Sequence, residues 1–234
     1  MLPAVILAGG LGTRLAGVTG GARPKALVEV AGRPFIDWKL AELSAAGIID
    51  VLLLVGHHGD ELAAHVGDGT AFGVRARFLA DGDVLLGTGG AIRRALPELP
   101  DAFWVTYGDS LLRVDIGAAE TVFARSQDVA LMTVWHNRNT LGPSNALVRD
   151  GLVVEYSKQP PPEGAEHIDY GMLLMTRAAF AGTPPDQQFD LAVVLTELAR
   201  SGRLGAFAVS ERFYEIGDAT TLGETDAELR RRAR

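Results

Sequence analysis

The sequence contains no cysteine in its 234 residues. This absence excludes a cysteine nucleophile, a thiolate zinc site and a disulfide scaffold. Positive charge is also scarce, because 22 Lys and Arg residues stand against 29 Asp and Glu residues, giving a formal net charge of -7. Such a surface repels nucleic acid, which binds through basic patches that displace counterions. We therefore expect chemistry based on oxygen, nitrogen or a metal ion, and no nucleic-acid partner.

The N-terminus has no long hydrophobic run. Its first apolar stretch, Ala4 to Ala8, follows no basic segment and stops at Gly9-Gly10. A stretch of this length is too short for a signal peptide or a membrane span. We therefore expect a cytoplasmic protein with no membrane partner.

What the chain does have is enough apolar material for a core, with 47% hydrophobic residues and a mean hydropathy of +0.15. Short apolar runs rich in β-branched or aromatic residues alternate with longer stretches of helical spacing, a pattern typical of α/β proteins. Strands are predicted at Ala4 to Ala8, Val51 to Val55, Val74 to Leu79 and Phe103 to Tyr107.

Helices are predicted from Pro34 to Gly47, from about Gly89 to Leu96 and from Asp190 to Gly202. The second half of the chain adds a strand from Ala130 to Trp135 and a hairpin around Asp150-Gly151. We therefore expect one α/β domain over residues 1–234, with a doubly wound core followed by antiparallel additions.

The most informative segment is the loop after the first strand, Leu7 to Leu15. Gly9, Gly10 and Gly12 let the backbone approach a ligand and direct amide groups at phosphate oxygens, and Arg14 and Lys25 supply counter-charge. The dinucleotide fingerprint fails because Leu15 stands where a third glycine is needed. A Walker-type loop fails because no Gly-Lys-Ser/Thr run follows the strand. An ordinary tight turn is the alternative.

These segments, with others in the same order, resemble the sugar-1-phosphate nucleotidyltransferases. The further matching stretches are Leu86 to Ala91, Gly108-Asp109, Tyr170-Gly171 and Phe213 to Asp218, so the resemblance spans nearly the whole chain. It implies a three-layer, Rossmann-like fold with a mixed, mostly parallel central sheet. It also implies an enzyme that joins a nucleoside triphosphate to a sugar 1-phosphate with Mg²⁺ and releases pyrophosphate. The sequence leaves a homo-oligomer open.

Site residues follow from the chemistry together with this resemblance. Two polyanions must meet in line, so catalysis depends on positioning and charge neutralisation. Asp109 follows a strand end, where open α/β sheets place ligands, and is the first metal ligand expected; Asp218 is the second by resemblance. Either aspartate could instead cap a helix or close a turn. The expected catalytic residues are Arg14, Lys25 and Asp109, and the expected nucleotide-binding residues are Leu7, Ala8, Gly9, Gly10, Gly12, Thr13, Arg14, Gly87, Thr88 and Gly89.

Lys158 resembles the lysine with which the family contacts the sugar phosphate. Its surroundings depart from the family's Glu-Lys-Pro pattern, because Ser157 precedes it and Gln159 follows it. Asp169, Tyr170 and Gly171 are the further expected sugar-phosphate contacts.

Substrate choice remains open at this level. The motifs look most like the small guanylyltransferases that act on a heptose 1-phosphate, so GTP is the expected nucleotide. Uridylyltransferases for amino-sugar phosphates are the alternative. A non-catalytic nucleotide-sugar sensor on the same fold would be expected to lose Lys25, Asp109 or Asp218, and all three are present.

Overall fold

Strand β1 (Ala4–Leu7) consists of four consecutive apolar residues, of which the first three are fully buried. A strand that is apolar on both faces is typical of a parallel sheet covered on both sides. It runs parallel to β4 (Asp50–Val55), which in turn runs parallel to β5 (Arg75–Ala80). The three strands predicted in this region are confirmed to within one residue at each end.

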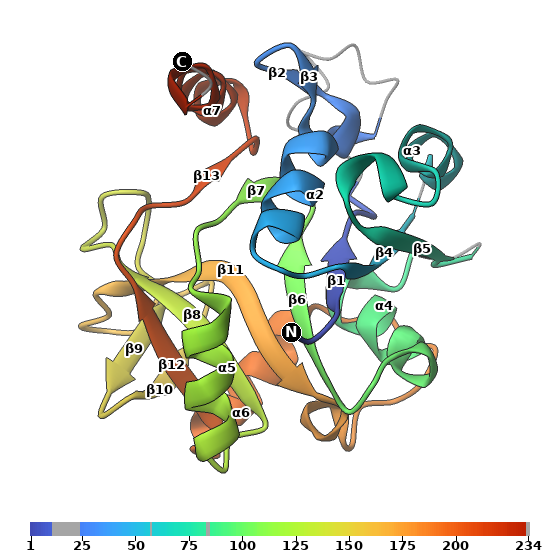
Figure 1. Cartoon of the computed structure of the whole chain (residues 1–234). Coiled ribbons are helices and arrows are strands. Elements are labelled where there is room, and N and C mark those ends of the chain that lie inside the picture. Colours follow the sequence, from blue (N-terminus) through green and yellow to red (C-terminus); the bar gives the residue numbers. More distant parts are fainter. Residues whose placement is uncertain (11–23, 57, 83–84, 233–234) are drawn as a thin grey trace. The chain divides into compact units, whose positions relative to one another are not determined.

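The computed structural model describes residues 1–10, 24–56, 58–82 and 85–232, and it divides into two compact units (Figure 1). Unit 1 comprises Met1–Leu2, Leu86–Val105 and Arg113–Arg212; unit 2 comprises Pro3–Leu85, Thr106–Leu112 and Phe213–Arg234. Each unit is therefore built from three separate stretches of the chain. That residues 1–234 form a single domain stays a prediction.

Unit 2 contains β1, β4 and β5 in the order β5-β4-β1. Helix α2 (Phe35–Ala45) begins directly after Pro34 and buries an apolar stripe, which confirms the helix predicted there. The other elements of this unit are η1 (Lys25–Leu27), β2 (Glu29–Val30), β3 (Arg33–Pro34), α3 (Gly59–Val66), η2 (Thr70–Phe72), β7 (Ser110–Leu111), β13 (Tyr214–Glu215) and α7 (Ala219–Arg232).

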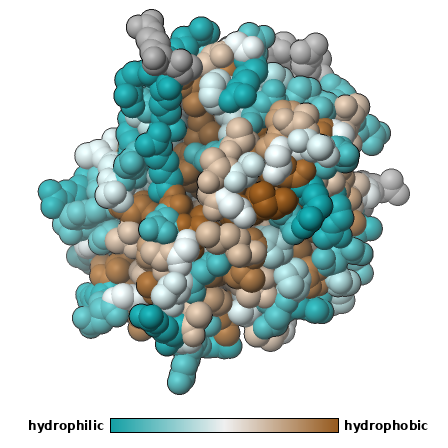
Figure 2. All heavy atoms as spheres, in the orientation of Figure 1, coloured by the Kyte–Doolittle hydropathy of each residue, from teal (hydrophilic) through white to brown (hydrophobic). Residues whose placement is uncertain are grey.

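The last helix, α7, closes a small core within unit 2. Leu229 of α7 packs in a buried cluster with Phe35, Leu111 and Ile216. These residues come from the beginning, middle and end of the sequence, so this core forms only when all three stretches of the unit are together. The outer surface of α7 is hydrophilic, as the teal spheres at the upper left of Figure 2 show.

Unit 1 contains the strand order β6-β11-β8-β12-β10-β9. Strand β11 (His167–Thr176) is antiparallel to β8 (Ala130–His136), whereas β12 (Leu204–Val209) is parallel to β8. The predicted hairpin is confirmed as β9 (Ala146–Arg149) and β10 (Leu152–Tyr156). The sheet is mixed, as predicted.

Helices flank these strands of unit 1. Figure 1 shows α5 (Ile116–Arg125) in front of β8 and β12, with α6 (Leu191–Arg200) behind them. The remaining elements are α4 (Gly87–Ala95), η3 (Leu96–Glu98), η4 (Arg177–Phe180) and β6 (Ala102–Tyr107), whose last two residues belong to unit 2. Among the described residues, no helix is both long enough and apolar enough to cross a bilayer.

Candidate active site

Unit 2 brings together two residues that the sequence separates by 84 positions. The Nζ atom of Lys25 donates a hydrogen bond to Oδ2 of Asp109 over 2.6 Å. The two side chains are 18% and 33% exposed, so both reach the surface from a partly buried position. Lys25 begins the short helix η1, and Asp109 lies two residues after the end of β6. The expected phosphate-binding lysine and the expected metal ligand therefore lie side by side.

Gly108 explains how Asp109 reaches the end of β1. Its backbone N–H donates to the carbonyl oxygen of Leu7 over 2.9 Å. A Cβ atom at Gly108 would lie 3.1 Å from that oxygen and 3.3 Å from Cγ2 of Ile6, both closer than most Cβ contacts. Glycine thus allows the backbone that bears Asp109 to lie against the end of the first strand.

Asp218 belongs to the same unit and serves as a helix cap. Its Oδ1 accepts a hydrogen bond of 2.9 Å from the backbone N–H of Thr221, at the start of α7. The stretch before it is held next to Asp109, because Ile216 N–H donates to the Asp109 carbonyl oxygen and β13 pairs with β7. The capping interpretation is confirmed, and the metal-binding role stays a prediction.

The N-terminal glycine loop is described only as far as Gly10. Gly9 lies against Gly56, where an added Cβ would come within 3.2 Å of the Gly56 nitrogen. Around Gly10 no described atom lies within 4 Å of an added Cβ. The expected residues Gly12, Thr13 and Arg14 lie outside the described residues, and Leu7 and Ala8 lead into the loop from β1.

In unit 1, the second glycine segment is packed against the protein itself. A Cβ at Gly89 would lie 2.2 Å from Cε2 of Phe189, and a Cβ at Gly87 would lie 2.7 Å from the Phe189 carbonyl oxygen. The N–H groups of Gly89 and Gly90 donate to that same oxygen. This packing accounts for glycine at these positions without any ligand, which the sequence did not reveal.

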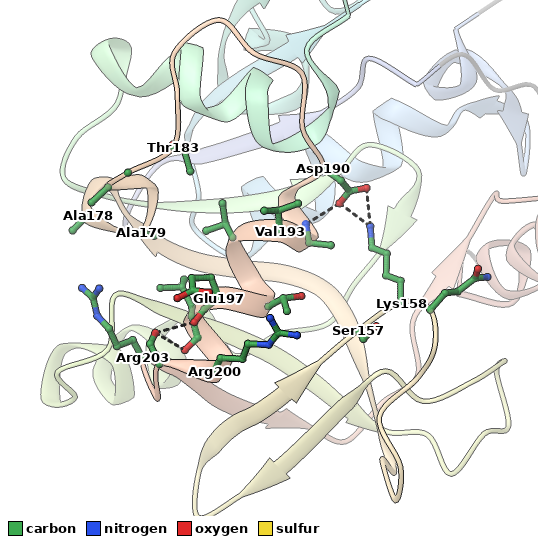
Figure 3. Close-up of a pocket in the computed structure, with 18 residues that line it drawn as sticks. Ser157, Lys158, Ala178, Ala179, Thr183, Asp190, Val193, Glu197, Arg200 and Arg203 are labelled. Carbon is green, nitrogen blue, oxygen red and sulfur yellow. Dashed lines mark hydrogen bonds and ion pairs between the residues drawn. The ribbon is translucent and has the colours of Figure 1, made fainter.

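Thr88 links this segment to the expected sugar-phosphate lysine. Its hydroxyl oxygen accepts the N–H of Leu191 over 2.8 Å, so Thr88 caps α6 rather than α4. Asp190 caps the same helix through Ala192 N–H and also binds Nζ of Lys158 at 3.0 and 3.2 Å (Figure 3). Burial would raise the pKa of Asp190, but the hydrogen bonds from Ala192 and Lys158 outweigh it and lower the pKa.

Lys158 and Asp190 lie at one end of a pocket of about 1090 Å³ in unit 1 (Figure 3). Helix α6 forms one long side of it, with Val193, Glu197 and Arg200 along the helix. The pocket combines cationic, anionic and apolar side chains. Asp190 was not among the residues predicted from the sequence; its only signal was its place as the first residue of the predicted third helix.

Asp169, Tyr170 and Gly171 lie on β11 in the same unit. Part of Asp169 reaches solvent, but its carboxyl group is enclosed. This burial raises the pKa of Asp169. The Gly171 N–H, the charge of Lys158 and the Tyr156 hydroxyl act in the opposite direction but do not outweigh it. The Gly171 N–H donates to Oδ1 of Asp169 over 2.9 Å, and the Tyr156 hydroxyl donates to Oδ2 over 3.2 Å. Tyr170 is buried, and its hydroxyl accepts from Arg113 N–H. The Tyr170 hydroxyl therefore fixes the backbone at Arg113, and its role as a sugar-phosphate contact stays a prediction.

The carboxylates of unit 2 suit a hard divalent cation. Among the described residues, no group of three or more His, Cys, Asp or Glu side chains is arranged to hold a metal ion. Magnesium commonly binds through one or two carboxylates, with substrate phosphates and water completing its coordination. Asp109 and Asp218 stay the predicted pair of magnesium ligands, and in this structure the cation beside Asp109 is the ammonium group of Lys25.

Comparison with known proteins identifies the family. Residues 4–162, more than half of the chain, match the model of the MobA-like NTP transferase domain. The chain is 28% identical to the N-acetylmuramate alpha-1-phosphate uridylyltransferase of Neisseria meningitidis, with 97% of each chain covered. It is 31% identical to the protein of the same name from Caulobacter vibrioides, with 97% and 96% covered. A D-glycero-alpha-D-manno-heptose 1-phosphate guanylyltransferase of Campylobacter jejuni is 24% identical, with 92% and 95% covered.

Solved structures show the same fold. A Bacillus anthracis protein crystallised with sucrose, assigned as a glucose-1-phosphate thymidylyltransferase, superposes with a TM-score of 0.86 over 98% of this chain and 96% of that one, at 21% identity. HddC from Yersinia pseudotuberculosis superposes with a TM-score of 0.83 over 98% of this chain and 100% of that one, at 23% identity. The predicted nucleotidyltransferase fold is therefore confirmed. The chain belongs to the MobA-like NTP transferase family and is a sugar-1-phosphate nucleotidyltransferase.

Proposed function

We propose that this enzyme transfers a uridylyl group from UTP to the 1-phosphate of an N-acetylated amino sugar such as N-acetylmuramate, releasing pyrophosphate. Support for this acceptor comes from the two uridylyltransferases that match the chain over nearly its full length. This substrate pair was the alternative at the level of sequence, where heptose guanylylation was the first expectation. The comparisons favour the alternative.

The observation that carries the chemistry is the 2.6 Å contact between Lys25 and Asp109. In the proposed reaction an oxygen of the sugar phosphate attacks the α-phosphorus of UTP, and the bond from that phosphorus to the bridging oxygen of pyrophosphate breaks. Lys25 neutralises charge on the triphosphate and the departing pyrophosphate. Because Lys25 rests on Asp109 in the free protein, the proposal requires Lys25 to exchange Asp109 for phosphate when the substrate binds.

Mg²⁺ is the proposed cofactor. When bound, it would neutralise the triphosphate and stabilise charge that develops on the leaving group. Asp109 and Asp218 would hold it, since both carboxylates belong to unit 2 and flank the β7–β13 pair. Arg14, Gly10 and Gly12 are the proposed triphosphate contacts of the N-terminal loop.

Lys158 is the proposed ligand of the acceptor phosphate. It lies in a pocket large enough for a sugar, and Asp190 orients its ammonium group. Asp169 and Gly171 are proposed to bind nearby hydroxyl groups. Gly87 to Gly89 are proposed to line the nucleoside, with Phe189 packing behind them.

Guanylyl transfer to a heptose 1-phosphate is a second candidate. It is supported by the Campylobacter jejuni guanylyltransferase, which matches 92% of this chain at 24% identity. The discrimination between uracil and guanine depends on a few hydrogen bonds, each contributing about 1 to 3 kcal/mol.

A single assay tests both candidates. The protein is incubated with Mg²⁺, one of ATP, CTP, GTP, UTP or dTTP, and one of N-acetylmuramate 1-phosphate, a heptose 1-phosphate or glucose 1-phosphate, and pyrophosphate release is measured. The highest kcat/KM is expected for UTP with N-acetylmuramate 1-phosphate. A preference for GTP with the heptose would replace this proposal with the second candidate, and release with no pair would contradict both.

A further inference from the structure

Helix α2 of unit 2 buries a lysine at a position that suits an apolar residue. Lys39 is 0% exposed and occupies the stripe formed by Ile36, Leu40 and Leu43. Its Nζ atom has no hydrogen-bond partner among the described residues, and its ion-pair contact with Glu42 is long, at 3.8 Å to Oε2. Burying an ammonium group without good hydrogen bonds is costly, so a methionine or leucine would serve packing better. Stability alone does not explain this lysine.

Glu42, one turn further along α2, anchors the segment that bears Asp109. Both of its carboxylate oxygens accept the backbone N–H of Leu112, at 3.1 and 3.0 Å. Leu112 lies three residues after Asp109, and the short strand β7 connects them. Since a carboxylate is a strong acceptor for a backbone N–H, Glu42 ties this segment firmly to α2.

A carboxylate in this place has an electrostatic consequence. Glu42 and Asp109 both stabilise the positive charge of Lys39, so Lys39 lies within electrostatic reach of both carboxylates. Burial lowers the pKa of Lys39, and the charges of Glu42 and Asp109 oppose this effect. Without Lys39, Glu42 would repel Asp109, and it would compete with Asp109 for the same cations.

We propose that Lys39 is a positioning residue, which neutralises Glu42 so that α2 can hold the Asp109–Leu112 segment by a carboxylate without displacing Asp109. This proposal rests on the proposed function, in which Asp109 binds the metal ion. Lys25 cannot take over the task, because it is partly exposed and is proposed to move to the phosphates. Lys39, being wholly enclosed, keeps its place throughout turnover.

The test uses the variants Lys39→Met, Glu42→Gln and the double variant that combines them. Lys39→Met leaves the Glu42 charge without its counter-charge, and we expect kcat to fall about tenfold or more, with the KM of each substrate changed less than about threefold. In the double variant glutamine still accepts the Leu112 N–H but carries no charge, so we expect most of the lost kcat to return. Leu40→Met, a volume-conserving change in the same stripe, is the matched control and should keep wild-type kcat.

Hydrogen exchange of the peptide covering residues 106–116 gives a readout that does not depend on activity. We expect faster exchange in Lys39→Met and a return toward the wild-type rate in the double variant. The inference would be overturned by a Lys39→Met variant with wild-type kcat and exchange, or by a double variant no better than Lys39→Met. If the wild type releases no pyrophosphate with any substrate pair, the proposed function fails, while the exchange measurement still decides whether Lys39 positions this segment.

Discussion

Two glycine-bearing segments, one in each unit, look alike in sequence and differ in structure. In unit 2, no described atom lies within 4 Å of a Cβ placed at Gly10. In unit 1, a Cβ placed at Gly89 would overlap the Phe189 ring at 2.2 Å. The same residue type thus stands at Gly89, where a neighbouring side chain leaves no room for a Cβ atom, and at Gly10, where no described neighbour does, and the sequence alone does not distinguish the two cases.

The two lysine–aspartate pairs differ in the same way. Lys25 and Asp109 are 18% and 33% exposed and both belong to motifs recognised in the sequence, whereas Lys158 and Asp190 are 47% and 53% exposed. An exposed pair is screened by water and contributes about 0 to 1 kcal/mol. We therefore expect unit 2 to be the more sensitive to substitution, and the predictions below test this contrast.

The largest effect is expected for Asp109→Asn in unit 2. The change removes the carboxylate charge that binds Lys25 and that is proposed to bind the metal ion. We therefore expect kcat to fall at least about 1,000-fold while the fold is retained. Asp115→Asn is the control, because it removes the charge of an aspartate that caps α5, by accepting the Ala118 N–H, and has no place in the proposed site. Turnover is measured by pyrophosphate release and folding by circular dichroism. Near-normal turnover in Asp109→Asn would remove this residue from the proposed metal site.

The contrast between the glycine segments predicts opposite outcomes for two alanine variants. Gly89→Ala should lower the free energy of unfolding by about 1 to 3 kcal/mol, because its methyl group overlaps Phe189. Gly10→Ala should change it by no more than about 0.5 kcal/mol, while raising the KM for the nucleotide. Chemical denaturation and steady-state kinetics separate these effects. Equal losses of stability in the two variants would break the comparison.

The exposed pair in unit 1 should give smaller effects. Lys158→Ala removes the proposed contact to the acceptor phosphate, so kcat/KM for the sugar phosphate should fall about tenfold, equivalent to about 1.4 kcal/mol. Asp190→Asn keeps the cap of α6 and loses only the charge, so a change of less than about threefold is expected. If Asp190→Asn lowered kcat/KM for the sugar phosphate as much as Lys158→Ala does, the Lys158–Asp190 pair would be as tightly coupled as the Lys25–Asp109 pair of unit 2.

The smallest effect is a dependence of stability on pH at Asp169. Burial raises the pKa of this carboxyl group, so ionisation costs more in the folded state than in the unfolded state. The folded state is therefore favoured most below the ordinary pKa of aspartate, and the advantage is lost as pH rises through the raised pKa. Asp169→Asn should melt at a higher temperature than the wild type at pH 7, with the difference vanishing in acid. Thermal unfolding between pH 3 and pH 8 provides the check, and a constant difference would contradict the prediction.

Much of the fold could be predicted because its strands are short and apolar on both faces. The strands β1, β4 and β6 and the helix α2 follow directly from such local patterns. Strand β11 was not predicted, because Gly171, at a φ of 90°, interrupts its pattern. Strand β12 was not predicted either, since Gly205 and two alanines give it little β-propensity.

The site was predictable only in part, for a similar reason. Local motifs indicated Lys25 and Asp109 separately, but their contact depends on the packing of segments 84 residues apart. No local rule identifies Phe189 as the group that fills the space above Gly89. Lys39 did leave a signal, because a lysine in the apolar stripe of a helix is unusual. Only the structure shows that Glu42, which lies beside it, accepts the backbone N–H of Leu112.

The pairing of β7 with β13 has a consequence for how the protein is made. It joins residues 110–111 to residues 214–215, so the segments that bear Asp109 and Asp218 come together only after nearly the whole chain has been synthesised. A nascent chain still attached to the ribosome can complete β1, α2 and β4 but lacks the partner of β7. The proposed pair of metal ligands would thus be assembled late, and an incomplete chain released early would lack Asp218, the second carboxylate of that proposed site.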